Sequence, residues 1–232
     1  MTKHSRRFKK VLNEVDVEKT YTLEEAAQIL KSVPSVKFDQ SVDISAKLSV
    51  DPRKAEQQVR GTVSLPKGTG KKIVLIVFAQ GDLVKEAEEA GADYVGSQDL
   101  FDKVKGGWTD FDVVLASPDM MREVGKLGKV LGPRGLMPSP KAGTVTRDIA
   151  TAVKEIKAGK IEYKVDKAAV INNQIGKLSF SAEDIVENAN TLISAIIKAK
   201  PSAAKGQYIQ SLFLTSTMGP GMRIDLQTLT TN

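Results

Sequence analysis

The chain has 232 residues, enough for one large or two modest domains, and its 41% share of hydrophobic residues is adequate for a packed core, which argues against global disorder. It contains no cysteine, so disulfides, a thiolate nucleophile and a cysteine-based zinc site are excluded. The formal net charge of +6 favours a polyanionic partner, and the absence of cysteine favours a cytoplasmic protein. The lack of a long apolar stretch and of a secretory signal predicts no membrane partner.

The first predicted elements are a basic arm and a helix. We expect the arm to be solvated and unstructured without a partner; its basic residues are Lys3, His4, Arg6, Arg7, Lys9 and Lys10. Thr22 and Glu25 have the spacing of a capping box, in which the threonine hydroxyl accepts from a backbone N–H and the glutamate reaches back. The pattern predicts a helix that ends before Pro34, because the residue before a proline disfavours helical backbone.

The character of the strands changes along the chain. Val42–Ser49 alternates strictly between apolar and polar residues and predicts a half-buried strand, and Gly61–Leu65 follows as a second strand. Ile73–Phe78 and Asp112–Ala116 are instead almost continuously apolar, as in parallel strands covered on both faces. Helices complete a small doubly wound α/β unit; they are predicted at Leu83–Ala90, Leu100–Lys105 and Arg147–Lys157.

The last region returns to antiparallel character. Ile161–Val165 predicts a strand, and Val170-Ile171 with Ile175–Phe180 predicts a hairpin. Ser181 begins a long amphipathic helix as its N-cap. Two final strands are predicted at Tyr208–Leu214 and Met222–Leu226.

Neither flanking region is complete alone, so we predict a fold of mixed α+β and α/β class with two domains. Residues 1–67 and 160–232 form a discontinuous outer domain, with two helices on one sheet, and residues 68–159 form an inserted α/β domain. Glycines at the two chain crossings permit a hinge; they are Gly68, Gly70 and Gly159. A single continuous α/β domain is the alternative.

The sequence lacks the groups that catalysis needs. The sole histidine is His4 in the arm, and no spacing of histidine with carboxylates suggests a metal site. Gly68–Lys71 resembles a phosphate loop, but Leu65 stands where that pattern needs a glycine, and Lys72 where it needs serine or threonine. Ala79–Asp82 replaces a glycine-rich dinucleotide turn. We therefore predict no catalytic residue, no metal and no cofactor.

Four polar clusters fit RNA, which is recognised through contacts to phosphates and 2′-hydroxyls. Ser216–Gly221 interrupts a β-prone segment with two hydroxyls, a methionine and a Gly-Pro-Gly turn, although a plain hairpin turn is an alternative. Phe38 can stack on a base, unless it fills the core, and Asp39 and Asp166 can accept a 2′-hydroxyl proton. We expect the clusters to converge at one edge of one sheet; the candidate RNA-binding residues are Lys37, Phe38, Ser41, Lys164, Asp166, Lys167, Lys177, Ser179, Ser216, Thr217, Met218 and Gly219.

The stretch Leu131–Lys141 is a second candidate contact for nucleic acid. It is rich in glycine and proline, and basic residues lie in it or just before it; they are Lys126, Lys129, Arg134 and Lys141. Long irregular loops in compact units are often functional, although a plain connection is the alternative.

Several segments of the chain closely resemble the L1 family of bacterial ribosomal proteins, which belong to the mobile stalk beside the tRNA exit site. The resemblance covers nearly the whole chain, and the matching segments are Lys37–Asp39, Asp51–Lys54, Arg60–Val63, Leu65-Pro66 with Gly68–Lys71, Leu131–Lys141 with Gly143–Thr146, Ile175–Lys177 with Ser179-Phe180, and Ser216–Gly221. The chain departs from the family pattern at Lys67, Ser139, Ala168, Ala169 and Asn172.

The resemblance implies a split β-α-β, ferredoxin-like outer domain with an inserted Rossmann-like domain. It implies a structural protein, not an enzyme, that binds a stem of large-subunit ribosomal RNA as a monomer within the ribosome. It also implies a role in releasing deacylated tRNA from the exit site, and repression of translation by binding the protein's own operon messenger RNA. Carried over by position, the RNA contacts fall on Phe38, Asp166, Lys167, Ser179, Thr217, Met218 and Gly219, with support from Lys37 and Ser41.

Two rival functions belong to other classes. A small α/β enzyme or nucleotide binder with an accessory domain would bind ATP or NAD in calorimetry. A nonspecific DNA binder would lose bound RNA to duplex DNA in competition, whereas a shape-specific RNA site would discriminate.

Overall fold

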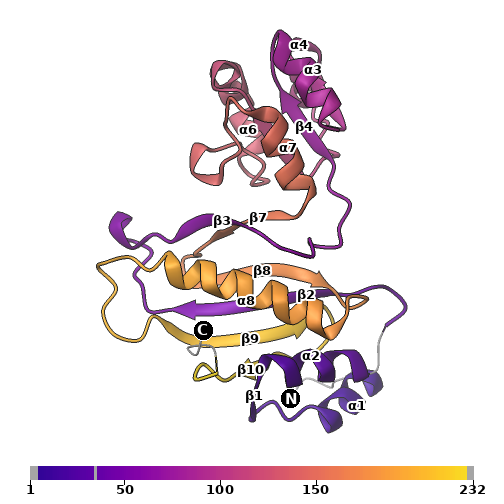
Figure 1. Ribbon diagram of the computed structural model, residues 1–232, viewed down its shortest axis with the longest axis vertical. Helices are drawn as coiled ribbons and strands as arrows, with labels where there is room; N and C mark the ends of the chain where they lie inside the picture. The colour runs from indigo at the N-terminus through magenta and orange to yellow at the C-terminus, as the bar shows by residue number, and fades with distance from the viewer. Residues whose placement is uncertain (1–4, 34–35, 229–232) are drawn as a thin grey trace. The chain divides into compact units, whose positions relative to one another are not determined.

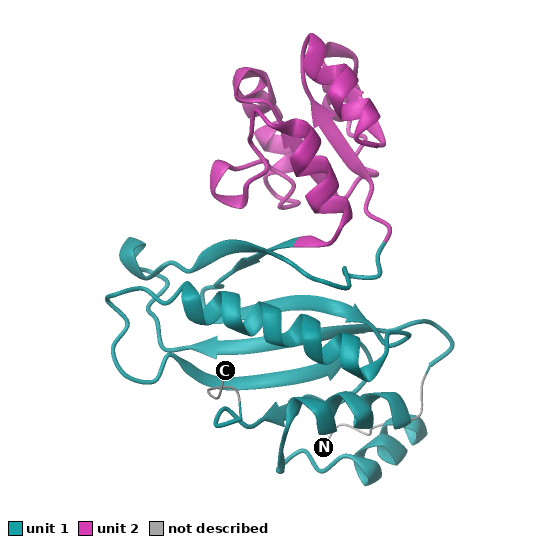
Figure 2. Ribbon diagram, viewed as in Figure 1, with its two compact units in different colours: residues 1–71, 161–232 teal, residues 72–160 magenta. Residues whose placement is uncertain are grey.

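The computed structural model describes residues 5–33 and 36–228, and the chain divides into two compact units. One unit is formed by the residues up to 71 together with those from 161 onward, and the other by residues 72–160 (Figure 2). The fold is of mixed α/β type with several sheets, as predicted. No helix in the described ranges combines the length and the apolarity needed to cross a bilayer.

A five-stranded sheet lies at the centre of the first unit, and both ends of the chain contribute to it (Figure 1). In spatial order its strands are β1 (Thr20–Tyr21), β10 (Met222–Ile224), β9 (Ile209–Ser216), β2 (Ser41–Leu48) and β8 (Val170–Lys177). Neighbours are antiparallel, except that β1 and β10 are parallel. Because β2 lies between β8 and β9, which follow residues 72–160 in the chain, neither terminal segment completes this sheet alone.

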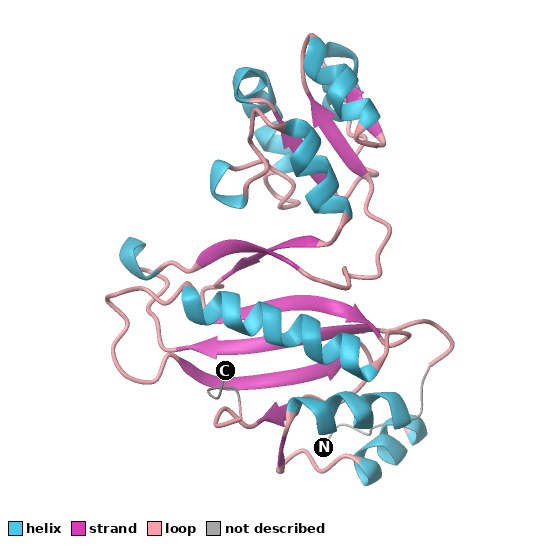
Figure 3. Cartoon of the chain, viewed as in Figure 1, coloured by secondary structure: helices cyan, strands magenta, loops and turns pink. Residues whose placement is uncertain are grey.

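Helices pack on this sheet through its alternating apolar residues. α2 (Leu23–Ser32) and α8 (Ala182–Lys198) contact each other and the strands (Figures 1 and 3). The predicted capping box is present: Thr22 Oγ1 accepts from the N–H of Glu25 at 3.2 Å, and Glu25 Oε2 accepts from the N–H of Thr22 at 3.1 Å. The predicted alternation in β2 is confirmed, since its apolar residues are at most 1% exposed; they are Val42, Ile44, Ala46 and Leu48.

The second unit is built on a three-stranded parallel sheet, with β4 (Leu75–Phe78) between β5 (Tyr94–Gly96) and β6 (Val113–Ala116). Every residue of β4 is fully buried, and alternate residues enter two different apolar clusters. The helices that supply these clusters include α3 (Asp82–Glu89), α4 (Gln98–Lys105), α5 (Met121–Val124), α6 (Gly128–Leu131) and α7 (Ile149–Lys157). The prediction of a parallel strand covered on both faces is therefore confirmed.

The segment that leaves the first unit is held against it by a buried amide. β3 (Arg60–Ser64) and β7 (Lys160–Lys164) pair in a two-stranded sheet. β3 comes before the second unit in the chain, and β7 begins where that unit ends. After β3, Asn188 of α8 donates to the carbonyls of Gly68 and Ile175 at 2.9 and 2.7 Å and accepts from the N–H of Lys67 at 3.1 Å. The first compact unit extends to residue 71, and the domain boundary predicted at residue 67 stays a prediction.

Glycine is required at these crossings by backbone geometry. Gly68, Gly70 and Gly159 have φ values of +66°, +69° and +109°, in the region that side chains disfavour. A hinge at these residues stays a prediction.

Two sequence predictions about local structure were wrong. Val170–Lys177 is one continuous strand and not a hairpin, because its polar centre pairs with β2 through Asn172, Asn173 and Gln174. The basic arm is not unstructured from Ser5 onward: α1 (Arg6–Glu14) is a helix that buries Val11 in the core, and its C-cap Val15 is buried there too. Lys3 and His4 lie outside the described residues.

Candidate RNA interface

Three of the four predicted clusters meet where neighbouring strands of the first unit end. Ser41 at the start of β2 is paired with Lys177 at the end of β8, and Val42 is paired with Ser216 at the end of β9. The loop before β2, the loop after β8 and the loop after β9 therefore share one end of the sheet. This group, the strand-end site, contains Lys37, Phe38, Ser41, Lys177, Ser179, Ser216, Thr217, Met218 and Gly219.

Thr217 joins two of these loops through both its backbone and its side chain. The Thr217 hydroxyl accepts from the N–H of Ser41 at 3.0 Å and donates to the carbonyl of Ser41 at 3.3 Å. The Thr217 N–H also donates to that carbonyl at 3.0 Å. The hydroxyl was predicted to contact RNA directly, but in the free protein it extends the pairing of β2 with β9 beyond the last strand residue.

Gln40 is the buried centre of the strand-end site, and the sequence did not single it out. Its side chain is only 3% exposed, and its Oε1 accepts from the N–H of Met218 at 2.9 Å. Its carbonyl accepts from the N–H of Leu178 at 2.8 Å. One residue thus fixes the loop after β9 and the loop after β8 against the loop before β2. Gln40 lies between two polar residues, Asp39 and Ser41, so nothing in the sequence distinguishes it from an exposed glutamine.

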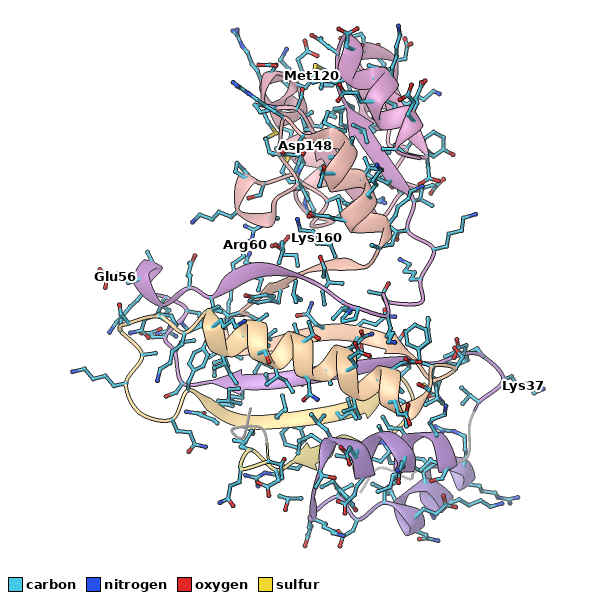
Figure 4. The ribbon with its side chains drawn as sticks, viewed as in Figure 1. Lys37, Glu56, Arg60, Met120, Asp148 and Lys160 are labelled. Atoms are coloured by element: carbon cyan, nitrogen blue, oxygen red, sulfur yellow. The ribbon has the colours of Figure 1, made fainter. Side chains whose placement is uncertain are left out.

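Two large apolar side chains stay exposed on this fixed framework. Phe38 is 53% exposed and Met218 is 45% exposed, so the alternative in which Phe38 fills the core is excluded. Lys37 precedes Phe38 and points away from the ribbon (Figure 4). Exposed apolar side chains on hydrogen-bonded loops suit a partner with flat groups that can stack on them.

Cations and hydroxyls complete the strand-end site. Lys177 Nζ donates to Ser41 Oγ at 3.2 Å. The Asp39 carboxylate accepts from Ser179 twice, from its N–H at 3.1 Å and from its hydroxyl at 2.9 Å. Asp39 was expected to accept from a 2′-hydroxyl, but here it holds the loop after β8.

The sheet next to the strand-end site carries a half-buried acid. Asp43 is the third residue of β2, and burial raises the pKa of its carboxyl, while the charge of Lys177 lowers that pKa by a smaller amount. Asp43 is paired with Thr215 on one side and Gln174 on the other. This polar row continues the site along the face of the sheet.

The fourth predicted cluster lies elsewhere, so the expected convergence is wrong for Lys164, Asp166 and Lys167. These residues precede Val170, which pairs with Lys47 at the opposite end of β2 from Ser41. At about 3.3 Å per strand residue the two ends are about 20 Å apart. Asp166 instead shapes its own turn, because its carboxylate accepts from the N–H groups of Ala168 and Val170, both at 2.8 Å.

The loop after β9 is also held from the N-terminal helix, a contact that sequence reasoning missed. Arg7 Nη2 donates to the carbonyl of Met218 at 2.8 Å. The spacing of the apolar residues Phe8, Val11 and Val15 is helical and could have indicated α1. No sequence signal indicates that Arg7 contacts Met218, which lies 211 positions further along the chain.

The strand-end site is built from exposed side chains on loops at one end of the sheet. No group of three or more acidic or histidine side chains in the described ranges could hold a metal ion. Its exposed groups are aromatic, apolar, cationic and hydroxyl side chains on hydrogen-bonded loops. Exposed groups of these kinds are typical of a protein surface that binds nucleic acid.

The comparisons with known proteins give the family. The profile of the ribosomal protein L1p/L10e family matches residues 29–220, and the chain belongs to this family. It is therefore a structural ribosomal protein with no enzymatic activity, as the sequence predicted, and it binds ribosomal RNA.

Three relatives are similar over nearly their whole length. Large ribosomal subunit protein uL1 of Protochlamydia amoebophila (strain UWE25) is 61% identical over 227 residues, which cover 98% of this chain and 96% of that protein. The proteins of the same name from Chlamydia pneumoniae and Chlamydia caviae are 59% and 58% identical over 229 residues, with 99% of each chain covered.

Proposed function

We propose that the protein is a constituent of the large ribosomal subunit in the cytoplasm and binds a stem of large-subunit ribosomal RNA through the strand-end site. The observation that carries this proposal is the exposure of Phe38 and Met218 on loops fixed by the buried Gln40. Phe38 stacks on a base or sugar, Lys37 and Lys177 face phosphates, and the hydroxyl of Ser179 meets 2′-hydroxyls. The RNA contacts predicted for Asp166 and Lys167 form a second point about 20 Å away along the strands.

The two remaining roles rest on the family resemblance. We propose that the protein is a monomer within the ribosome and assists the release of deacylated tRNA from the exit site. We also propose that it represses translation by binding its own operon messenger RNA. The same site serves both RNAs if the messenger RNA presents the same shape as the ribosomal stem. Under this proposal residues 72–160 form the inserted domain and a hinge at Gly68, Gly70 and Gly159 lets it move.

Replacing Phe38 by alanine tests the strand-end site directly. We expect Phe38→Ala to weaken binding of a large-subunit RNA stem by about 1–3 kcal/mol, or about 5- to 150-fold in Kd, because an aromatic stacking surface is lost. Filter binding at fixed salt measures this change, and the operon messenger RNA should lose affinity by the same factor. Tyr94→Ala is the matched control, since Tyr94 is 43% exposed in the other unit. Equal losses for the two variants would contradict the assignment.

Removal of the inserted unit tests where RNA affinity lies. The large apolar core of the first unit contains no residue from 72–160, so a chain in which a short glycine-serine linker replaces those residues should fold. We expect its Kd for the ribosomal stem to stay within about threefold of the full chain, because every residue of the strand-end site is retained and only the candidate stretch Leu131–Lys141 is removed. A folded chain that has lost affinity would place the main contacts in residues 72–160.

A further inference from the structure

We propose that α1 forms one wall of the RNA-binding surface and that Arg7 is its positioning residue, an inference that rests on the function proposed above. Ser5 is the N-cap of α1, and its hydroxyl accepts from the N–H of Phe8 at 3.2 Å. Val11 and Val15 are 0% and 2% exposed in the same core as the central sheet. The helix is therefore docked on the unit that carries the strand-end site.

The chain after α1 is fixed as well. The Tyr21 hydroxyl donates to the carbonyl of Asp16 at 2.9 Å and accepts from its N–H at 3.1 Å. Tyr21 belongs to β1, which pairs with β10, the strand that follows the Ser216–Gly221 loop. The chain after α1 and the chain after the loop therefore pair with each other at one edge of the sheet, and this pairing brings the helix and the loop together.

Arg7 acts on the backbone of the loop. Its guanidinium donates to the carbonyl of Met218 at 2.8 Å, while Gln40 accepts from the N–H of the same residue at 2.9 Å. Both backbone groups of Met218 are therefore held, and the orientation of its exposed side chain is set by residues from two other segments. Gly219 closes the turn by donating to the carbonyl of Ser216 at 3.0 Å.

The arginine also has capacity left for RNA. A guanidinium has five N–H donors, and one of them makes the bond to Met218. Arg7 is only partly buried, so its other donors can reach a phosphate next to the base that contacts Met218. Under this proposal Arg7 both orients the loop after β9 and binds a phosphate of the RNA.

The helix supplies its own control. Successive helical residues are about 100° apart, so Lys9 lies about 160° around the helix from Arg7, whereas Val11 lies about 40° from it. Lys9 is exposed, and its replacement by glutamine removes one positive charge, as the replacement of Arg7 by glutamine does. Arg7→Gln and Lys9→Gln therefore differ in the loop contact and agree in net charge.

The experiment measures Kd of the full chain for a large-subunit ribosomal RNA stem and for an unrelated RNA hairpin over a range of salt. We expect Arg7→Gln to weaken binding of the ribosomal stem about tenfold with a much smaller effect on the hairpin, and to reduce the salt slope by about one phosphate contact. We expect Lys9→Gln to change both RNAs equally and by less than about threefold. Arg7→Lys, which keeps the charge without the planar fork, should recover part of the discrimination.

The outcomes separate the two proposals. If Arg7→Gln still discriminates between the two RNAs as the wild type does, or if Lys9→Gln loses as much discrimination, the role of Arg7 is overturned and the proposed function stands. A wild-type protein that binds both RNAs equally overturns the proposed function and this inference with it. Thermal unfolding of each variant verifies that it is folded, and if Arg7→Gln is not, Arg7→Lys against Lys9→Gln makes the same comparison.

Discussion

Replacing Asn188 by leucine is expected to lower the free energy of unfolding of the first unit by about 3–5 kcal/mol. The side chain is fully buried and makes three hydrogen bonds to backbone groups, which belong to Lys67, Gly68 and Ile175. Leucine has a similar volume and no polar atoms, so the backbone groups lose their partners. Each buried group left without a partner costs about 1–3 kcal/mol, and local relaxation recovers part of the sum.

The two units can be followed separately in this experiment. The chain has one tryptophan, Trp108, and it lies in the second unit. Tryptophan fluorescence during urea unfolding therefore reports on residues 72–160, whereas circular dichroism reports on both units. We expect Asn188→Leu to shift part of the dichroism transition to lower urea and to leave the fluorescence midpoint in place.

Asn190 provides the matched control, because it lies two residues further along α8 and is exposed. Asn190→Leu should change stability by less than about 0.5 kcal/mol, as is usual for surface substitutions. If the two variants have the same unfolding midpoint, the amide of Asn188 does not hold the crossing segment in place.

Local patterns predicted the elements whose causes are local. The capping box of Thr22 and Glu25 depends on residues three apart, and the alternation of β2 depends on which side chains face the core. The run that became β4 was continuous because both of its faces are covered. In each case the sequence carries the physical reason within a few residues.

The strand-end site could be predicted only in part, because it depends on pairing between distant strands. The exposed Phe38 and the Ser216–Gly221 loop were recognised by residue type. That Ser41 pairs with Lys177, and that Lys164 and Asp166 fall at the other end of β2, follows from a register that spans more than 100 residues. The polar residues at the centre of β8 suggested a turn, because the strand β2 with which they pair lies far away in the sequence.

The second large effect is expected at Gly70, where the crossing segment touches the strand-end site. Its φ is +69°, and an added Cβ would lie 2.8 Å from Cγ of Lys177 and 2.9 Å from Cε1 of Phe180. Gly70→Ala must therefore strain the backbone, by about 1–2 kcal/mol, and also displace side chains on β8 and the loop after it. We expect a total loss of about 2–4 kcal/mol of stability, and a weaker Kd for the ribosomal stem because Lys177 shifts away from Ser41.

Gly206 separates the two causes. Its φ of +74° is almost the same, but nothing lies within 4 Å of an added Cβ. Gly206→Ala should cost only the backbone strain of about 1–2 kcal/mol and leave RNA affinity unchanged. Since Gln174 also donates to the carbonyl of Thr69 at 3.2 Å, β8 contacts the crossing segment at the residue before Gly70 as well. An altered crossing therefore changes the RNA site through β8, and this coupling is wrong if Gly70→Ala loses stability but binds the stem as tightly as Gly206→Ala does.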